Sequence, residues 1–339
     1  MEENKNTVRI SAAAMQERFT AILVREGFRD DKALKCAEAF THNSLDGVYT
    51  HGVYRFPRFV QYIKGGFVKV NEAPTLENKF GGIEQWNGNL GPGILNAFQA
   101  TDTVMGLAKQ NGIGCVALRN TNHWMRGGTY GWKAAKAGYV FIGWTNTIAN
   151  MPAWGAKDAR LGNNPLVMAL PYKDEAIVLD MAMSQYSFGA MEKAALNNEK
   201  LSVYGGFDEH GALTDDPGLI LESLRPLPVG YWKGAGLSLL LDLLATILSG
   251  GFATHEISKK EVEYGLSQVF IAIDVSKLGN HSAIAKVIEA ILNDYQQSVP
   301  VSESKKIMYP GERALQTRRT NLADGIPVLK EVWDEILTL

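Results

Sequence analysis

Two side chains in the run THGVYR (50–55) could do chemistry together, a histidine at 51 and an arginine at 55. An imidazole titrates at roughly pH 6.5 and can exchange a proton near neutrality. The guanidinium of Arg55 can bind a carboxylate through two parallel hydrogen bonds. If residues 51–55 form a helical turn, His51 and Arg55 lie on one face and would hold a 2-oxo acid with its carbonyl near the imidazole. The pattern is equally compatible with a helix junction at which His51 satisfies backbone groups and Arg55 is solvated.

A second polar island, RNTNHWMRGG (119–128), contains His123. The neighbouring Asn120 and Asn122 can orient an imidazole or a substrate hydroxyl, and the glycines allow backbone to approach a ligand closely. A structural turn with a hydrogen-bonded histidine is the alternative. The other four histidines lie in helix ends or loops without polar neighbours and are predicted to be surface residues: His42, His210, His255 and His281.

The composition indicates a globular protein that binds a small molecule. The chain has 339 residues, of which 46% are apolar, enough for a substantial core. Its 34 basic and 36 acidic residues are interspersed and leave a net charge of -2, so neither nucleic acid nor a membrane surface is expected as a partner. Cys36 and Cys115 form no CxxC pair and are expected to be buried free thiols. With a polar amino terminus lacking a secretory signal, they predict a cytoplasmic protein.

The periodicity of apolar residues predicts an α/β fold. The first 75 or so residues are expected to be entirely helical, with Ser11 capping the first helix and a third helix at 57–64. An apolar run at 237–248 predicts a buried helix that is too short to cross a bilayer. Further helices and strands are predicted along the rest of the chain, with surface loops at 205–218: a helix leading from Gly93, helices at 130–137, 282–297 and 328–339, and strands at 114–118, 139–145, 176–181 and 269–275.

Motifs of several enzyme classes are missing from the sequence. The sequence contains no HExxH motif and no histidine pair at helical spacing, either of which would indicate a metal site. It also contains no GxSxG elbow, which would indicate a serine hydrolase. The GxGxxG fingerprint of Rossmann enzymes does not occur between a strand and a helix. Two glycine-containing helix starts could bind an anion, one with Lys233 in WKGAG (232–236) and one in PGER (310–313).

The sequence resembles the malate/L-lactate dehydrogenase family that is unrelated to the Rossmann dehydrogenases. The resemblance is carried in order over nearly the whole chain by eight segments: THGVYRFPRF (50–59), GIEQWNGN (82–89), ALRNTNHWMRGGTYGW (117–132), WTNTIANMPAWGAK (144–157), NNPLVMALP (163–171), VLDMAMS (178–184), GYWKGAGLSLLLD (230–242) and YGLSQVFIAID (264–274). It implies a helical domain of residues 1–75 with 308–339, an α/β domain of residues 76–307 around a mixed sheet with a non-Rossmann nicotinamide site, and a homodimer with sites near the subunit contact.

The resemblance also implies roles for individual residues. His51 matches the family's proton donor, His123 matches the acid/base of other members, and these two assignments compete. Arg55, with Thr50 beside His51, is expected to bind the substrate carboxylate. The following residues fall where family members contact the dinucleotide: Thr147, Ala176, Ile177, Val178, Leu179, Asp180, Met181, Ala182, Trp232, Lys233, Gly311, Glu312 and Arg313.

The expected reaction is the reduction of a 2-oxo acid by NADH, with 2,3-diketo-L-gulonate as the expected substrate. Asp180 could accept from a ribose hydroxyl and favours NAD, although NADP stays open. Thr50 and Thr147 replace expected serines, and Glu312-Arg313 replaces His-Glu. The alternatives within the family are oxidation of ureidoglycolate, malate or L-lactate and reduction of a cyclic imino acid. Outside it they are a non-catalytic metabolite sensor and a metal-dependent hydrolase.

Overall fold

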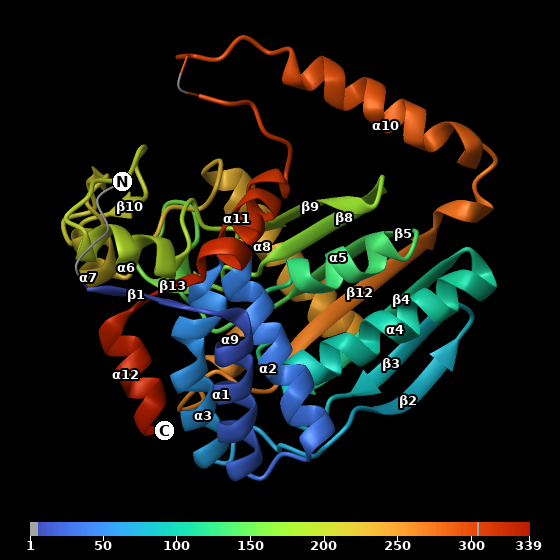
Figure 1. The fold of residues 1–339 in the computed structure, drawn as a ribbon, viewed down its shortest axis with the longest axis horizontal. Coiled ribbons are helices and arrows are strands. Elements are labelled where there is room, and N and C mark those ends of the chain that lie inside the picture. Colours follow the sequence, from blue (N-terminus) through green and yellow to red (C-terminus); the bar gives the residue numbers. More distant parts are fainter. Residues whose placement is uncertain (1–5, 304) are drawn as a thin grey trace.

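The computed structural model describes residues 6–303 and 305–339, in which a group of helices lies beside a seven-stranded mixed sheet (Figure 1). The α/β class predicted from the sequence is confirmed. The helical group begins with three helices from the first part of the chain: α1 (Ala12–Arg25), α2 (Asp30–Leu45) and α3 (Phe56–Lys64).

Aromatic packing holds these three helices together. Helix α1 begins as predicted, because the Ser11 hydroxyl accepts a hydrogen bond from the N–H of Ala14 at 3.2 Å. The buried ring of Phe19 on α1 stacks on Phe56 of α3 with centroids 3.9 Å apart. Phe40 of α2 meets Phe56 edge to face at 5.3 Å. This cluster fixes both ends of the segment that links α2 to α3.

The prediction that the first 75 residues are entirely helical is wrong at strand β1 (Thr7–Ile10). This strand pairs in antiparallel register with β13 (Ile326–Leu329), near the other end of the chain. Its four residues are too few to show a period, and its partner is remote in sequence, so local pattern could not reveal it. For the same reason the helix predicted at 328–339 is shorter, since α12 spans Lys330–Thr338.

The central sheet has the strand order β2-β3-β4-β12-β5-β8-β9. Strands β3 and β4 are parallel and the other neighbours are antiparallel. The strands predicted near 114–118, 139–145, 176–181 and 269–275 are confirmed, and β2, β3 and β8 are additional. The bounds are β2 (Thr75–Phe80), β3 (Ile83–Asn87), β4 (Ile113–Thr121), β12 (Leu266–Asp274), β5 (Tyr139–Thr145), β8 (Leu166–Tyr172) and β9 (Glu175–Met181).

Helices cover both faces of the sheet. On one face α4 (Gly93–Asn111) and α5 (Gly128–Lys136) pack on residues such as Leu118 and Phe270. On the other face α8 (Trp232–Ser249) packs on residues such as Ala117 and Val269, which alternate with the first pair along the same strands. Strand β9 forms one edge of the sheet, so its outer backbone groups are available to other partners.

The prediction that the apolar run 237–248 is a buried helix is wrong for about half of its residues. The inner residues Leu241 and Ala245 are buried against the sheet, but the outer residues Leu240 and Ile247 are 55% and 71% exposed. By length and composition alone α8 could also cross a membrane, a test that sheet-packed helices of soluble proteins pass as well. Its contacts with β12, β4 and β5 identify it as part of the folded domain, with an apolar outer face.

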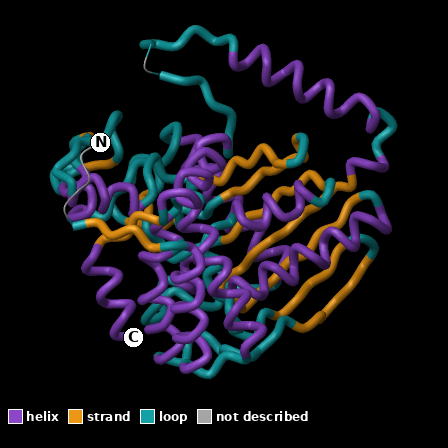
Figure 2. The backbone as a smooth tube through the Cα atoms, in the orientation of Figure 1, coloured by secondary structure: helices purple, strands orange, loops and turns teal. Residues whose placement is uncertain are grey.

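Two further parts of the chain extend from this body. The segment 205–218, predicted as surface loops, contains the short hairpin β10 (Gly206–Phe207) with β11 (Leu213–Thr214) and the start of α7 (Pro217–Ser223), which packs on α6 (Phe188–Leu196). Helix α10 (His281–Gln296) projects away from the sheet, and residues 305–311 form an extended strap that leads back to α11 (Glu312–Asp324) (Figure 2). Smaller elements include η3 (Val275–Lys277), α9 (Thr254–Ile257), and the strand pair β6 (Met151–Pro152) with β7 (Ala159–Leu161).

Candidate active site

A cavity of about 1080 Å³ lies between the helical group and the β9 edge of the sheet. Four segments supply most of its wall: the link between α2 and α3 (46–51), the loop before α5 (123–127), the second half of β9, and residues 306–317 of the strap and α11. Its volume slightly exceeds the roughly 300–1000 Å³ of typical small-ligand pockets. The cavity is therefore large enough for a dinucleotide and a small acid.

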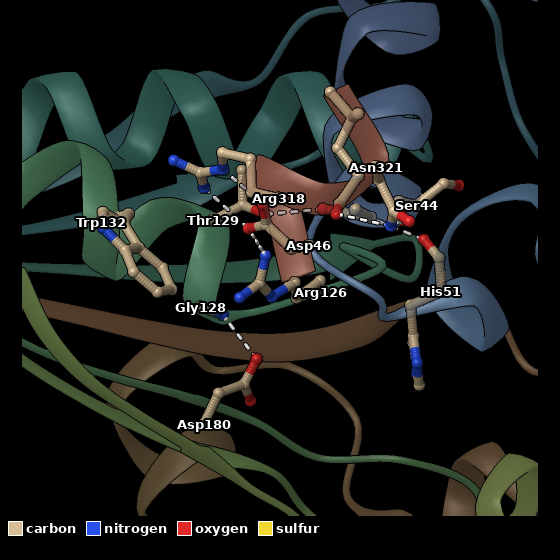
Figure 3. Close-up of polar contacts among 12 residues, drawn as sticks. Ser44, Asp46, His51, Arg126, Gly128, Thr129, Trp132, Asp180, Arg318 and Asn321 are labelled. Carbon is tan, nitrogen blue, oxygen red and sulfur yellow. Dashed lines mark hydrogen bonds and ion pairs between the residues drawn. The ribbon is translucent and has the colours of Figure 1, made fainter. Parts of the chain in front are cut away.

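His51 reaches the cavity from the link between α2 and α3. This link contains two 3-10 turns, η1 (Tyr49–His51) and η2 (Val53–Arg55), separated by Gly52 at φ -115° and ψ -122°. The prediction of a single helical turn through 51–55 is therefore wrong. The His51 carbonyl accepts a hydrogen bond from Asn43 Nδ2 at 2.9 Å, and its ring Nδ1 lies 3.2 Å from the Thr50 hydroxyl. Figure 3 shows the ring pointing away from the polar cluster around Asp46.

His123 lies against His51, with ring centroids 5.6 Å apart and ring planes 23° from parallel. Its Nδ1 accepts a hydrogen bond from the backbone N–H of Met125 at 3.0 Å. Burial, together with the charges of Arg55 and Arg126, lowers the pKa of His51 to about 4. Burial and the charges of Arg55 and His51 also hold the pKa of His123 well below its usual value. Both rings are therefore neutral at neutral pH, and an anion bound beside them would raise both pKa values.

Arg55 does not line the main cavity. It faces a separate cavity of about 10 Å³, which it shares with Arg58, Tyr62 and His123. This volume is room for about one water molecule. Within residues 6–303 and 305–339 the guanidinium of Arg55 has no hydrogen bond or ion pair, and burial lowers its pKa. An unpaired, half-buried cation next to His123 is suited to receive an anion, once the small cavity widens.

A network of two cations on one carboxylate forms another part of the wall (Figure 3). Asp46, only 2% exposed as a side chain, accepts short hydrogen bonds from Arg126 and also from Arg318, whose Nη2 lies 2.8 Å from Oδ2. The guanidinium carbons of Arg126 and Arg318 lie 5.2 Å and 5.4 Å from the centre of the Trp132 ring. Because Arg318 belongs to α11 and Arg126 to the loop that carries His123, the network joins the C-terminal part of the chain to that loop.

Asp180 lies across the cavity on the edge strand β9. Its Oδ2 accepts a hydrogen bond from the N–H of Gly128 at 2.7 Å. The carboxyl group is open to the cavity but surrounded by protein, and this burial raises its pKa against the opposing effect of Arg126. Next to it, the N–H of Val178 donates to the carbonyl of Pro310 at 3.0 Å, so the strap is attached to the sheet edge.

The structure brings together most of the residues that the sequence singles out. Those that line the main cavity are Thr50, His51, His123, Thr147, Val178, Leu179, Asp180, Ala182, Gly311 and Arg313. Those that do not line it are Arg55, Ala176, Ile177, Met181, Trp232, Lys233 and Glu312. Trp232 and Lys233 are exposed at the start of α8, and Glu312 is buried in a salt bridge with Lys306 at 2.6 Å.

Several polar residues of the cavity wall were not predicted as site residues. Arg126 belongs to the same polar island as His123, which is a usable signal, whereas Asp46 and Lys193 lie in ordinary helical surroundings. Asn163 is a further case, since its Oδ1 accepts from Thr147 Oγ1 and from the Asn150 amide, both at 3.1 Å. Only the folded chain places these residues around one space.

Comparison with known proteins gives consistent matches over nearly the full chain. A family model described as malate/L-lactate dehydrogenase matches residues 10–337. The chain is 42% identical over 333 residues to the 2,3-diketo-L-gulonate reductase of Klebsiella pneumoniae (strain 342), covering 98% of this chain and 100% of the relative. A solved structure of a putative malate/lactate dehydrogenase from E. coli has a TM-score of 0.90 and 26% identity, covering 98% of this chain and 94% of that one. Malate dehydrogenase from Pyrococcus horikoshii OT3 gives 0.88 and 26%, with the same coverage.

Proposed function

Because the chain belongs to the malate/L-lactate dehydrogenase family and is therefore an oxidoreductase, we propose that it reduces a 2-oxo acid with NADH, and that its substrate is 2,3-diketo-L-gulonate, which gives 3-keto-L-gulonate. The observation that carries the proposal is the stacked pair His51 and His123, which faces a cavity of dinucleotide size and has the unpaired Arg55 behind it. The 42% identity to a full-length 2,3-diketo-L-gulonate reductase supports this substrate. The reaction would be a step of sugar-acid metabolism.

The cavity wall fits a nicotinamide dinucleotide. Gly311 has a φ of 96°, and a Cβ at this position would lie 3.2 Å from both Trp132 and the backbone nitrogen of Val178, so the absence of a side chain keeps this cradle open. Lys193 and Arg313 supply positive charge for a pyrophosphate. When bound, the reduced cofactor supplies a hydride to the substrate carbon. We propose that Thr147, Leu179, Asp180, Ala182, Gly311 and Arg313 hold it.

Asp180 favours NAD over NADP in this proposal. Its Oδ2 accepts from the N–H of Gly128, whereas its Oδ1 accepts no hydrogen bond from the described residues and could accept one from a ribose hydroxyl. A 2′-phosphate in the same place would meet a carboxylate of like charge. NADP binding would require Asp180 to be protonated or displaced.

The remaining chemistry is positioning and proton supply. Arg55 would bind the substrate carboxylate, and the carbonyl oxygen would then lie near the two imidazoles. Either His51 or His123 would protonate this oxygen as negative charge develops on it. Burial, with the nearby arginine charges, holds both imidazole pKa values low. The substrate carboxylate would offset the arginine charges, so its binding would favour the protonated donor.

We also propose that the protein is a cytoplasmic homodimer. The outer face of α8 exposes Leu239, Leu240, Leu243, Leu244 and Ile247, an apolar surface of a kind that marks protein contacts. In two copies related by a twofold axis this face would pack on itself. A cytoplasmic location agrees with Cys36, a buried thiol that forms no disulfide.

A substrate panel tests the proposed reaction. Purified protein is mixed with NADH and, separately, with 2,3-diketo-L-gulonate, oxo forms of malate and lactate, and a cyclic imino acid; ureidoglycolate is offered with NAD. We expect the largest kcat/KM with 2,3-diketo-L-gulonate. A larger value with another compound would move the assignment to that member's reaction. Binding of NADH without turnover of any compound would identify a sensor, and activity that a chelator abolishes and NADH does not affect would identify a hydrolase.

A further inference from the structure

The two stacked imidazoles differ in what faces their Nδ1 atoms. The Nδ1 of His123 accepts from the backbone N–H of Met125, a group that can only donate. The Nδ1 of His51 lies 3.2 Å from the Thr50 hydroxyl, which can donate or accept. A protonated Nδ1 on His123 would place two donors against each other, whereas the Thr50 hydroxyl can rotate to accept from a protonated His51.

We propose that His123 is held as a neutral imidazole that donates a hydrogen bond from Nε2 to the substrate carbonyl oxygen, and that His51 alone transfers the proton. The inference rests on the proposed reduction and assigns separate roles within the same site. It follows from tautomer chemistry, because a neutral ring that accepts at Nδ1 must carry its hydrogen on Nε2. A neutral imidazole can polarise a carbonyl in this way without giving up its proton.

The loop around His123 leaves the ring little freedom to escape this arrangement. The Asn122 amide donates to the carbonyls of Leu90 and Gly91 at 2.8 Å and 3.1 Å. Gly93 packs so closely on the loop that a Cβ there would lie 2.1 Å from the carbonyl oxygen of Asn122. Met125 has a φ of 66°, an unusual conformation for a non-glycine residue, and its N–H points at the ring.

The Tyr130 hydroxyl holds the loop on the other side of His123, where it donates to the carbonyl of Trp124 at 2.6 Å. Tyr130 and Trp124 are both almost completely buried. The conformation that aims the Met125 N–H is therefore fixed from several directions.

The charged groups around the pair act on both rings in the same direction. Arg55 on η2 and Arg58 on α3 face His123, while Arg55 and Arg126 act on His51. Acidic groups act on these arginines and not directly on the rings: Glu263 offsets Arg55, Asp46 forms an ion pair with Arg126, and Asp180 also interacts with Arg126. An anionic substrate would ease protonation of both rings, so the Met125 N–H is the feature that separates them.

The proton transfer balances with one histidine. The substrate carbon receives the hydride, its carbonyl π bond breaks, and the oxygen takes the proton as the Nε2–H bond of the His51 imidazolium breaks. His51 becomes neutral and recovers a proton from solvent through the cavity, while His123 keeps its hydrogen throughout. The net change is a 2-oxo acid, a hydride and a proton giving a 2-hydroxy acid.

Nitrogen NMR on the full-length protein with isotope-labelled histidine rings tests the tautomer directly. The six histidines are assigned with single variants, including H123Q and H51Q. We expect His123 to show an unprotonated Nδ1 and a protonated Nε2 across the neutral range, both free and with NADH plus oxamate, an unreactive oxo-acid analogue. A proton on Nδ1 of His123 in either state would overturn the proposal. This readout needs no turnover, so it is separate from a failure of the proposed reaction.

The pH dependence of single-turnover NADH oxidation tests the division of roles. Reduction by wild-type protein should slow as rising pH deprotonates the donor. The H123Q variant places an amide N–H near the position of Nε2, so it should keep the pH dependence of the single-turnover rate and lose about tenfold or less of that rate. H123A should lose roughly 100- to 1000-fold of the rate. H51Q should lose the dependence of the rate on pH. A slope that disappears in H123Q and persists in H51Q, or wild-type rates in both variants, would refute the assignment.

Discussion

Replacing Asp46 by Asn should destabilise the protein strongly, because this single carboxylate neutralises two arginines, Arg126 of the cavity wall and Arg318 of α11. The Asp46 and Arg126 side chains are 2% and 7% exposed, and Arg318 is 30% exposed. Removing one partner of such a buried ion pair costs about 3–5 kcal/mol, since it leaves an uncompensated charge in a poorly hydrated place. With an unfolding entropy of about 2 cal/mol/K per residue over 339 residues, this lowers the Tm by roughly 4–7 °C.

Differential scanning calorimetry on D46N and wild type measures this shift. D102N is a matched control, because Asp102 makes a 2.8 Å ion pair with Lys133 in which the side chains are 50% and 35% exposed. An exposed pair of this kind contributes about 0–1 kcal/mol, so the control should move the Tm by little more than 1 °C. If D46N and D102N had equal Tm values, Asp46 would not be acting as the buried counter-ion of both arginines.

Three further predictions follow from the site and the surface. R55Q should raise KM for a 2-oxo acid about 100-fold, equivalent to ~3 kcal/mol, without lowering the Tm or NADH affinity, because the Arg55 guanidinium has no hydrogen bond or ion pair to lose among the described residues; an unchanged KM would remove Arg55 from the substrate site. The double variant L240E/I247E should convert the dimer into a monomer in light scattering, whereas L34E on α2 should not; a dimer that persists would exclude the α8 face. The pKa of His51 is about 4 in the folded state against an ordinary value of 6.5, so the unfolded state binds more protons between these two pH values. Wild type should therefore lose about 3 kcal/mol of stability as pH falls through this window, and H51Q should lose less; equal losses would contradict the lowered pKa.

The sequence predicted those parts of the fold that depend on local pattern. The Ser11 cap, the third helix and strands such as β5 all carry caps or apolar periods within a few residues. Strand β1 could not be predicted, because its pairing with β13 depends on residues more than 300 positions away. The half-exposed helix α8 was predicted as buried for a different reason: an apolar residue that faces the core and one that faces solvent or another subunit look the same in a sequence.

The candidate site was predictable to a similar degree. His51 and His123 were singled out by their polar surroundings, and the fold brings them to 5.6 Å. His51 and Arg55 do not share one helical face, because Gly52 separates the segment into two turns and Arg55 faces a separate small cavity. Asp46 gave no signal, since an aspartate at a helix end is ordinary until two distant arginines are folded onto it.

Transfer of a labelled hydride tests whether this protein reduces the substrate carbonyl with NADH. The protein is incubated with 2,3-diketo-L-gulonate and NADH that carries deuterium at the transferable position of its nicotinamide ring, and the product is examined by mass spectrometry. We expect a hydroxy acid that has gained one deuterium on carbon, in amounts equal to the NADH oxidised. A product without the label, or no consumption of NADH with this or any other 2-oxo acid, would contradict it.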